Sequence, residues 1–165
     1  MDAHEVADNA RVWVYQSNRK FEDKEVESIS KELQSFVSEW TAHNQQLHGL
    51  SKVMYNHFLV LIVDESKAQA SGCSIDKSIK VIQEIEQKYD LKLFNRTDIS
   101  YRDEKGEIQI IDINQFKELG KSGVVNSDTI VFNNLVTDYL GFKTKWEVPV
   151  SLSWHQNFFF SNQLA

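Results

Sequence analysis

The sequence contains little cysteine, proline or glycine. Its 165 residues include one Cys, one Pro and six Gly. A single Cys excludes an intrachain disulfide and any zinc site built from a cysteine cluster. So few Pro and Gly residues leave no flexible linker, and we find no internal repeat. We therefore predict a single globular domain over residues 1–165.

The sequence also lacks a long hydrophobic run. The longest one, residues 58–63, has six apolar residues. A membrane-spanning helix needs about 20. Residues 1–9 are polar and acidic, without the basic start and apolar stretch of a signal peptide. A lone thiol fits a reducing compartment, so we expect no membrane span and a cytoplasmic protein.

Basic residues are outnumbered by acidic ones. There are 18 Lys and Arg against 24 Asp and Glu, which gives a net charge of −6, and no dense basic run exists. An acidic surface disfavours non-specific binding of nucleic acid, so we expect no nucleic-acid partner. The 41% of hydrophobic residues and 25% of charged residues are typical of a folded protein rather than a disordered one.

The first part of the chain predicts a strand followed by an amphipathic helix. Residues 12–15, Val-Trp-Val-Tyr, are strand formers. Acidic residues then crowd positions 22–25, where the dipole of a starting helix favours them. Apolar residues recur at three- and four-residue steps up to Trp40, which predicts a helix over 23–40. This stripe consists of Val26, Ile29, Leu33, Phe36, Val37 and Trp40.

The most hydrophobic stretch follows. Residues 57–63 predict a central strand with both of its faces covered, because the run after His57 is apolar throughout. Residues 50–55 predict a short strand before it, and Asn56 suits the left-handed backbone of a turn between the two. Residues 41–49 are expected to form a loop or the lead-in to this strand pair.

A second helix is predicted over 75–89. Its apolar residues again recur at helical spacing, and Ser74 is the expected N-cap, since its hydroxyl can accept a hydrogen bond from a backbone N–H one turn on. Residues 98–102 and 107–111 predict a hairpin whose four-residue connection ends in Gly106, which suits a positive φ.

The last third of the chain predicts shorter elements. Residues 114–119 are expected to form one or two helical turns, and 129–136 a strand. Pro149 confines residues 146–154 to the edge of a sheet or to an extended segment. The three Phe residues at 158–160 are expected to dock on the body of the protein or on a partner, because exposed they would form an apolar patch.

The order strand, helix, strand, strand, helix, strand indicates the fold class α+β. It is typical of a split βαβ, ferredoxin-like sandwich, with helices on one face of an antiparallel sheet that further strands extend. The alternative is a three-layer α/β sheet, which follows if residues 50–55 do not form a strand.

The best candidate site lies where the central strand leads into the second helix. N–H groups and the dipole at a helix N-terminus stabilise an anion or a thiolate, and Gly72 would let a ligand approach the backbone closely. Cys73 is the candidate catalytic residue. The candidate ligand-binding residues are Gly72, Cys73, Ser74 and Asp64.

Each of these residues also has a purely structural explanation. Unreactive cysteines are usually buried, so we expect Cys73 to be a small residue packed under a tight turn. Asp64, Glu65 and Asp76 carry oxygen ligands of the kind a divalent cation prefers. Their spacing matches no metal motif, however, and acids at the end of a strand are usually solvated, so we predict no metal site.

A Cys–His pair would need a histidine close to Cys73 in space. His57 begins the strand whose other end leads to Cys73, which places it about 20 Å away at the usual rise per residue. His43 and His155 remain as candidates that the sequence neither supports nor removes.

Four runs together resemble a family of short bacterial proteins with no established function. They are residues 10–19 (ARVWVYQSNR), 71–76 (SGCSID), 129–135 (TIVFNNL) and 146–149 (WEVP). The resemblance covers nearly the whole chain, but these runs denote no known chemistry and supply no functional residues. Some members of the family carry the label "ABC transporter ATPase".

The residues do not support that label. Gly120-Lys121-Ser122 matches the last three letters of a P-loop, whose backbone and Lys bind the phosphates of ATP. The first Gly of the motif would fall at position 115, which is Gln115. The Leu-Ser-Gly-Gly-Gln signature of such ATPases is also absent, so we expect no ATPase activity.

The sequence therefore predicts a small α+β protein that binds a partner or a small ligand. The alternative is an enzyme that uses Cys73, or an anion held at the N-terminus of the helix starting near Ser74. No motif identifies a cofactor. The partners left open are a small anion, another protein and a second copy of the chain.

Overall fold

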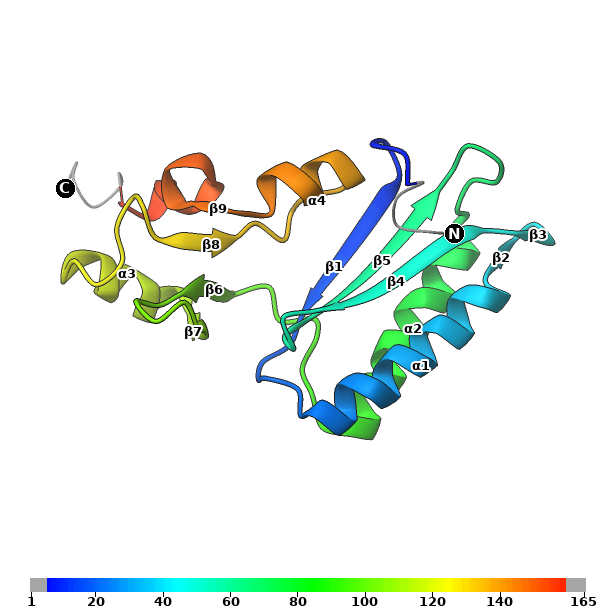
Figure 1. Cartoon of the computed structure of the whole chain (residues 1–165), viewed down its shortest axis with the longest axis horizontal. Coiled ribbons are helices and arrows are strands. Elements are labelled where there is room, and N and C mark those ends of the chain that lie inside the picture. Colours follow the sequence, from blue (N-terminus) through cyan, green and yellow to red (C-terminus); the bar gives the residue numbers. More distant parts are fainter. Residues whose placement is uncertain (1–5, 160–165) are drawn as a thin grey trace. The chain divides into compact units, whose positions relative to one another are not determined.

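The computed structural model describes residues 6–159, which form two compact units. Unit 1 holds the chain up to Phe94 together with Thr137–Leu140, and unit 2 holds Asn95–Val136 and the chain from Gly141 onward. The described residues contain three antiparallel sheets and belong to the α+β class, as predicted (Figure 1). None of the helices described is long and apolar enough to span a membrane. The single domain over 1–165 stays a prediction.

Unit 1 contains two helices and a three-stranded sheet of order β1-β5-β4, with a two-stranded hairpin, β2-β3. The central position of β5 is confirmed, and the hairpin lies where we expected a loop. The elements are β1 (Arg11–Gln16), α1 (Asp23–Glu39), β2 (Thr41–Ala42), β3 (Gln45–Gln46), β4 (His48–Met54), β5 (Phe58–Asp64) and α2 (Gly72–Tyr89).

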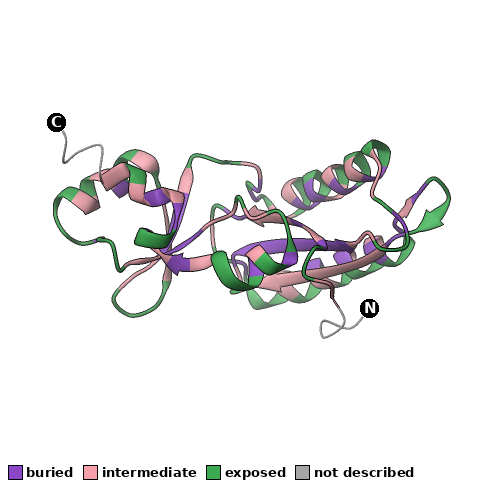
Figure 2. Ribbon diagram, turned by 90° about the horizontal axis from the view of Figure 1, so that it is seen from above, coloured by how far each residue is buried: buried purple, intermediate pink, exposed green. Residues whose placement is uncertain are grey.

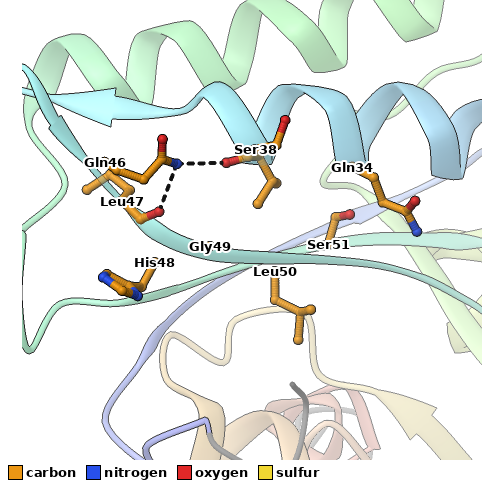
Figure 3. Close-up of a pocket in the computed structure, with 9 residues that line it drawn as sticks. Gln34, Ser38, Gln46, Leu47, His48, Gly49, Leu50 and Ser51 are labelled. Atoms are coloured by element: carbon orange, nitrogen blue, oxygen red, sulfur yellow. Dashed lines mark hydrogen bonds between the residues drawn. The ribbon is translucent and has the colours of Figure 1, made fainter. Parts of the chain in front are cut away.

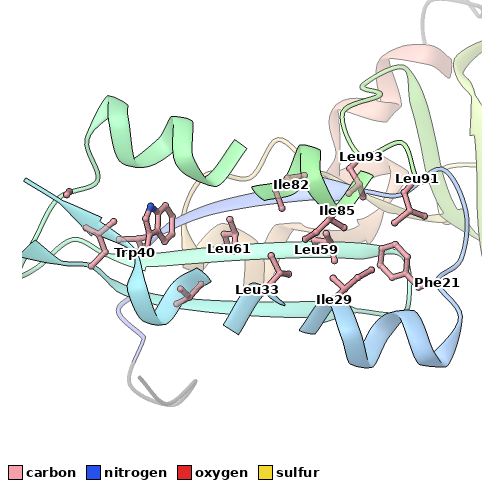
Figure 4. Packing of buried hydrophobic residues seen from close by; sticks show 14 of the residues in the cluster. Phe21, Ile29, Leu33, Trp40, Leu59, Leu61, Ile82, Ile85, Leu91 and Leu93 are labelled. Carbon is pink, nitrogen blue, oxygen red and sulfur yellow. The ribbon is translucent and has the colours of Figure 1, made fainter. Parts of the chain in front are cut away.

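The core of unit 1 lies between this sheet and the two helices, which lie on the same side of it (Figure 1). All six apolar residues of β5 are buried, as its uniform hydrophobicity predicts. Leu59, Leu61 and Val63 point into the cluster formed with the helices, and Ile29 and Leu33 meet them from α1 (Figure 4). Burying a side chain of this size contributes about 1.5–3 kcal/mol, so these few contacts dominate the stability of the unit.

Each helix of unit 1 divides cleanly into a buried and an exposed side, which Figure 2 shows along the ribbons. On α1 the buried residues are Ile29, Leu33 and Val37, the middle of the predicted stripe. The indole N–H of Trp40 donates to the carbonyl of Ser74 over 2.8 Å and joins the end of α1 to the first turn of α2. Since α1 covers Asp23–Glu39, the predicted helix over 23–40 is confirmed within one residue.

A second link between the helices is formed by a partly buried ion pair. The guanidinium of Arg19 donates to both carboxylate oxygens of Glu25, at 2.8 and 2.9 Å, and to the carbonyl of Tyr89 at 2.7 Å. The hydrogen bonds from Arg19 lower the pKa of Glu25 to about 2. Because the pKa is lower in the folded state, the pair stabilises the fold above the ordinary pKa of Glu, and this stabilisation is lost as the pH falls towards 2.

The turn between β4 and β5 has the predicted left-handed backbone. Tyr55 and Asn56 have φ values of 53° and 57°. Asn tolerates this region well, and the carbonyl of Met54 accepts a hydrogen bond from the N–H of His57 at 3.0 Å. This closes the hairpin that makes residues 48–54 a strand, so the alternative of a three-layer α/β sheet is wrong.

The fourth strand expected after α2 does not join this sheet. Residues 98–102 form β6, as predicted, but β6 pairs with β7 and β8 in the sheet of unit 2. Beside β1 lies instead the short segment Thr137–Leu140, whose carbonyl at Thr137 accepts from the N–H of Val12 at 3.0 Å. A pattern of local hydrophobicity gives no information on which sheet a strand joins, because every antiparallel strand presents the same alternation.

Unit 2 contains a four-stranded antiparallel sheet of order β7-β6-β8-β9. The hairpin β6-β7 turns at Gly106 with φ of 79°, and Pro149 lies in the edge strand β9, both as predicted. The remaining elements are β6 (Asp98–Arg102), β7 (Ile108–Asp112), α3 (Ile113–Lys121), β8 (Ile130–Phe132), α4 (Tyr139–Lys145), β9 (Glu147–Pro149) and two 3-10 helices, Val150–Leu152 and Trp154–Gln156.

Strand β8 is shorter than predicted, and α4 was not predicted at all. The strand ends before Asn133, whose side chain accepts from the N–H of Leu135 at 3.1 Å and forms a turn. The side chain of Asn134 accepts from the indole of Trp146 at 2.9 Å. The side-chain hydrogen bonds of these two asparagines therefore end the strand, which hydrophobicity alone would extend to residue 136.

An aromatic cluster forms the core of unit 2 around Phe116 of α3, which is fully buried. Phe158 and Phe159 pack edge-on against Phe116, with ring centroids 6.2 and 5.7 Å away. The predicted docking on the body of the protein is confirmed for these two residues, while Phe160 lies outside the described range. A Cβ on Gly120 would lie 2.4 Å from the ring of Phe159, so the ring would have to shift to admit any other residue there.

His155 is buried in the same core. Its exposed fraction is 1%, its ring stacks on Trp154 at 3.9 Å between centroids, and its Nδ1 lies 2.6 Å from the hydroxyl of Ser153. Burial disfavours the charged imidazolium and lowers the pKa of His155 to about 4. The folded protein therefore holds a neutral histidine well below the pH at which an exposed one would protonate.

This burial predicts a pH-dependent stability for unit 2. Because the pKa is lower in the folded than in the unfolded chain, the unfolded chain binds the extra proton, and stability is complete above about pH 6.5 and falls towards pH 4. The expected loss between pH 7 and pH 5 is about 2 kcal/mol, measured by urea unfolding at each pH. His155→Gln should be less stable at pH 7 but should lack this part of the pH dependence. An identical slope in both proteins would contradict the prediction.

Two glycines should respond in opposite directions to alanine. A Cβ on Gly49 of β4 would lie 2.9 Å from Cγ1 of Val37, so Gly49 lets α1 approach the sheet. A Cβ on Gly72 has no neighbour within 4 Å. We expect Gly49→Ala to destabilise by about 1–3 kcal/mol through overpacking and Gly72→Ala to stabilise by about 0.5–1 kcal/mol as a better helix former. Thermal unfolding of both variants checks this, and equal shifts would disprove it.

Candidate functional site

The turn at the start of α2 differs from its prediction in one detail that matters for its chemistry. The helix begins at Gly72, and the N-cap is Ser71 rather than Ser74. Ser71 accepts from the N–H of Ser74 at 3.1 Å, while the hydroxyl of Ser74 accepts from the N–H of Ser71 at 2.7 Å and donates to its carbonyl at 2.8 Å. Two serines three residues apart form this reciprocal cap, and the one placed further outside becomes the N-cap.

The cap leaves less of this turn for a ligand than we expected. Ser74 is fully buried and its hydroxyl is already bonded on both sides. The space beside Gly72 is open, so the absence of a side chain there is not required by packing. Cys73 is exposed, and the expectation that it packs under the turn is wrong. The reason is that Ser74, one position along the helix, occupies the inward direction instead.

The carboxylates near this turn accept hydrogen bonds from backbone N–H groups of the loop that precedes α2. Asp64 accepts from the N–H of Ser66 at 2.9 Å, and this bond lowers the pKa of Asp64. Glu65 accepts from the N–H of Ala70 at 2.9 Å and lies 3.7 Å from the guanidinium of Arg11. Within residues 6–159 no three His, Cys, Asp or Glu side chains gather closely enough to hold a metal ion.

None of the hydrogen bonds described for the histidines considered for a Cys–His pair involves Cys73. His155 belongs to the core of unit 2, and His43 has a φ of 50° in the tight turn between β2 and β3. The Nδ1 of His57 lies 2.8 Å from the carbonyl of Tyr55. What the structure shows at the start of α2 is an exposed thiol, that of Cys73, and a helix end capped by Ser71.

The partial P-loop match has the wrong backbone geometry for phosphate binding. Lys121 is the last residue of α3, and Ser122 is its C-cap. A P-loop precedes a helix and offers N–H groups to the phosphates, whereas the end of a helix offers carbonyl oxygens. Lys121 also pairs with Glu118, at 3.2 Å.

A groove of about 560 Å³ that we had not predicted lies in unit 1, between α1 and β4. We call it the edge groove, because β4 is an outer strand of its sheet. Helix α1 forms one wall and β4 the other (Figure 3). The lining residues are Gln34, Val37, Ser38, Gln46, Leu47, His48, Gly49, Leu50 and Ser51.

Gln46 lines the edge groove and bonds to both of the segments that flank it. Its side-chain amide nitrogen donates to the carbonyls of Val37 and Leu47, at 3.3 and 3.2 Å (Figure 3), and to the carbonyl of Trp40 at 3.1 Å. The carbonyls of Val37 and Trp40 also accept from the backbone N–H groups of Trp40 and Leu47, at 3.3 and 2.9 Å, so Gln46 adds to bonds that already close the end of α1. A single amide thus joins the end of α1 to Leu47, the residue before β4.

The sequence carried one signal for this groove. β4 reads His-Gly-Leu-Ser-Lys-Val-Met, whereas β5 reads Phe-Leu-Val-Leu-Ile-Val-Asp. A strand that mixes polar and apolar residues beside one that is wholly apolar is expected at the edge of a sheet. What the sequence lacks is any indication that α1 would stand over that edge.

Comparison of the chain with protein-family models, with curated proteins and with solved structures finds no match. The bacterial family that the sequence resembles is therefore neither supported nor contradicted, and the geometry of the molecule carries the functional argument.

Proposed function

We propose that this protein acts by binding another protein, and that the edge groove of unit 1 receives the partner. The observation that carries the proposal is the outer side of β4, which pairs with no strand in the described part of the chain and lies next to a groove of about 560 Å³. This volume lies within the range of ligand-binding pockets in proteins, about 300–1,000 Å³. The groove is braced by Gln46 rather than filled, so it is ready to accept a ligand without rearrangement.

The lining of the groove supports a protein partner over a small charged metabolite. None of the nine lining residues is Asp, Glu, Lys or Arg, although a quarter of the chain is charged. A charged metabolite needs opposite charges in its site. Serine and glutamine side chains beside Val37, Leu47 and Leu50 instead suit the mixed polar and apolar surface of a peptide chain.

The same proposal includes a split βαβ, ferredoxin-like arrangement of unit 1. Two observations support it: the chain order β1, α1, β4, β5, α2 and the strand order β1-β5-β4. The segment Thr137–Leu140 then stands in for the fourth strand beside β1. One edge of this sheet is then covered, while the other, β4, pairs with no further strand among residues 6–159 and is the edge that we assign to a partner.

Two further expectations are retained as proposals. The first is membership in the resembled bacterial family, which the four runs support. The second is a cytoplasmic location, which Cys73 supports, because it is an exposed free thiol of the kind that a reducing compartment preserves.

Blocking the groove should abolish binding. The probe is a displayed library of random nine-residue peptides, selected on the wild-type chain. Ser38 lines the groove and Ser35 lies on the exposed part of the same helix. We expect Ser38→Trp to weaken a selected peptide by at least about tenfold, because the indole occupies the groove, whereas Ser35→Trp should bind as the wild type does. Equal binding by both variants, measured by calorimetry, would contradict the proposal.

The second candidate function is an enzyme that uses Cys73, and the exposure of this thiol is the observation that favours it. Under our proposal the thiol is an ordinary surface group. Its rate of reaction with a disulfide reagent at pH 6 should match that of a small-molecule thiol within about threefold. A Cys73→Ser variant provides the blank. A rate more than about tenfold higher, or a sulfate bound at Gly72 and Cys73 in soaked crystals, would favour the enzyme instead.

A further inference from the structure

The hydrogen-bonding pattern of the sheet shows which backbone groups of β4 face the edge groove. The N–H of Ser17 donates to the carbonyl of His57 at 2.8 Å, so this carbonyl faces β1, and the N–H of Phe58, on the opposite side of the same trans peptide, faces β4. Backbone direction alternates along a strand, so Phe58, Val60, Ile62 and Asp64 turn their groups towards β4. Their partners in the register are Met54, Lys52, Leu50 and His48.

The intervening residues of β4 must therefore direct their backbone outward. These are Gly49, Ser51 and Val53. In the described part of the chain β4 pairs with β5 alone, so these three N–H and three C=O groups have no strand partner there, and Gly49 and Ser51 are among the residues that line the groove. Open edges of this kind accept a further strand readily.

Helix α1 covers this edge from one side. Helices pack about 8–10 Å apart and strands about 4.8 Å apart, so two helices over three strands stand above the two outer strands. The close approach of Val37 to Gly49 places α1 above β4. With a radius of about 5 Å, α1 extends past β4 by the width of one strand and covers the position where an added strand would lie.

This cover decides against a second copy of the chain as the occupant. Pairing β4 with β4 of another copy would place the two α1 helices on the same face of a continuous sheet. Each helix would stand above its own β4, so their axes would be separated by about one strand spacing, 4.8 Å. Packed helices require about 8–10 Å. The occupant must therefore be an extended segment without a helix of its own above it.

Side-chain chemistry narrows the class of segment. Ser51 points towards α1 while Leu50 points away from it (Figure 3). A strand paired with β4 would alternate in the same way, so its residues opposite Gly49, Ser51 and Val53 lie under α1 and must be small and uncharged. The residues opposite Leu50 and Lys52 lie on the other face. The groove lining contains no carboxylate, and Lys52 has no ion-pair partner among the described residues.

We propose that the edge groove binds an extended peptide segment of a partner protein as an added strand on β4. The backbones of Gly49, Ser51 and Val53 hydrogen-bond to the segment, α1 selects small uncharged residues at alternate positions, and Leu50 and Lys52 favour an apolar and an acidic residue between them. This inference rests on the proposed function, and adds to it the mode of recognition and the chemistry of the partner.

Amide hydrogen exchange of the wild-type chain, with and without a selected nine-residue peptide, tests the pairing directly. The amides of Gly49, Ser51 and Val53 should exchange at least about tenfold more slowly when the peptide is bound, because exchange then requires breaking the new bonds. The amides of Leu50 and Lys52 already bond to β5 and should change little. Selected peptides should carry small residues at every second position and an acidic residue between two of them.

Two matched pairs separate backbone from side-chain recognition. Ser51→Pro removes an outward N–H and should weaken binding at least about tenfold, while Ser51→Ala keeps that N–H and should bind within about threefold of the wild type. On the peptide, N-methylation at a residue whose N–H faces β4 should abolish binding, and N-methylation at the next residue should not. The second pair leaves the protein unchanged, so it remains decisive if Ser51→Pro fails to fold.

The outcomes distinguish this inference from the function on which it rests. Peptides that are lost in Ser38→Trp, but that leave the three amides unprotected and tolerate both N-methylations, would overturn strand addition and keep the groove as the binding site. If no peptide binds, both proposals fail. A dimer detected by light scattering, with Gly49, Ser51 and Val53 protected without any peptide, would overturn the inference by identifying a second copy as the occupant.

Discussion

The burial of β5 is the constraint on which the rest of unit 1 depends. Six consecutive apolar residues, Phe58–Val63, have no exposed surface. A strand with both faces covered needs a neighbour on each edge and a layer above it. β1 and β4 supply the neighbours, and Leu59, Leu61 and Val63 bring α1 and α2 onto one face. With about 1.5–3 kcal/mol for each buried side chain, no other set of contacts in the unit competes with this one.

The same constraint explains why the unit has one open edge. The outer side of β1 is met by Thr137–Leu140, which bonds to Ala10 and Val12. No comparable segment among the described residues meets β4, which carries Ser51 and Lys52 where β5 has only apolar residues. A polar, partly covered edge resists aggregation, yet it keeps backbone donors and acceptors available. Under the function that we propose, stability and recognition therefore depend on neighbouring strands of one sheet.

Local hydrogen bonds then determine which parts of the surface are free to act. The reciprocal cap of Ser71 and Ser74 uses the hydroxyls at the start of α2, and Gln46 uses the carbonyls at the end of α1. Both helix ends are therefore satisfied within the chain. Within residues 6–159, the edge of β4 pairs with no further strand, and this is the edge to which our proposal assigns the partner.

Local pattern in the sequence was sufficient for most elements and for the class. The stripe up to Trp40, the uniform run of β5, the turn at Asn56 and the edge position of Pro149 each follow from one element and its nearest neighbours. The elements that local pattern missed depend on side-chain amides, as at Asn133 and Asn134, or on the competition between two serines for one cap. In these places a hydrogen bond of about 1 kcal/mol decides between conformations of similar energy.

Only the tertiary structure decided where function could reside. The sequence directed attention to Cys73, because a thiol beside a helix start is a recognisable chemical pattern. The edge groove has no such pattern, since it consists of backbone groups and of a space between α1 and β4. Residues 34–38 and 46–51 meet there because Gly49 admits Val37 and because β5 leaves β4 outermost. Both reasons depend on contacts between residues distant in the chain, and periodicity along a sequence carries no information about them.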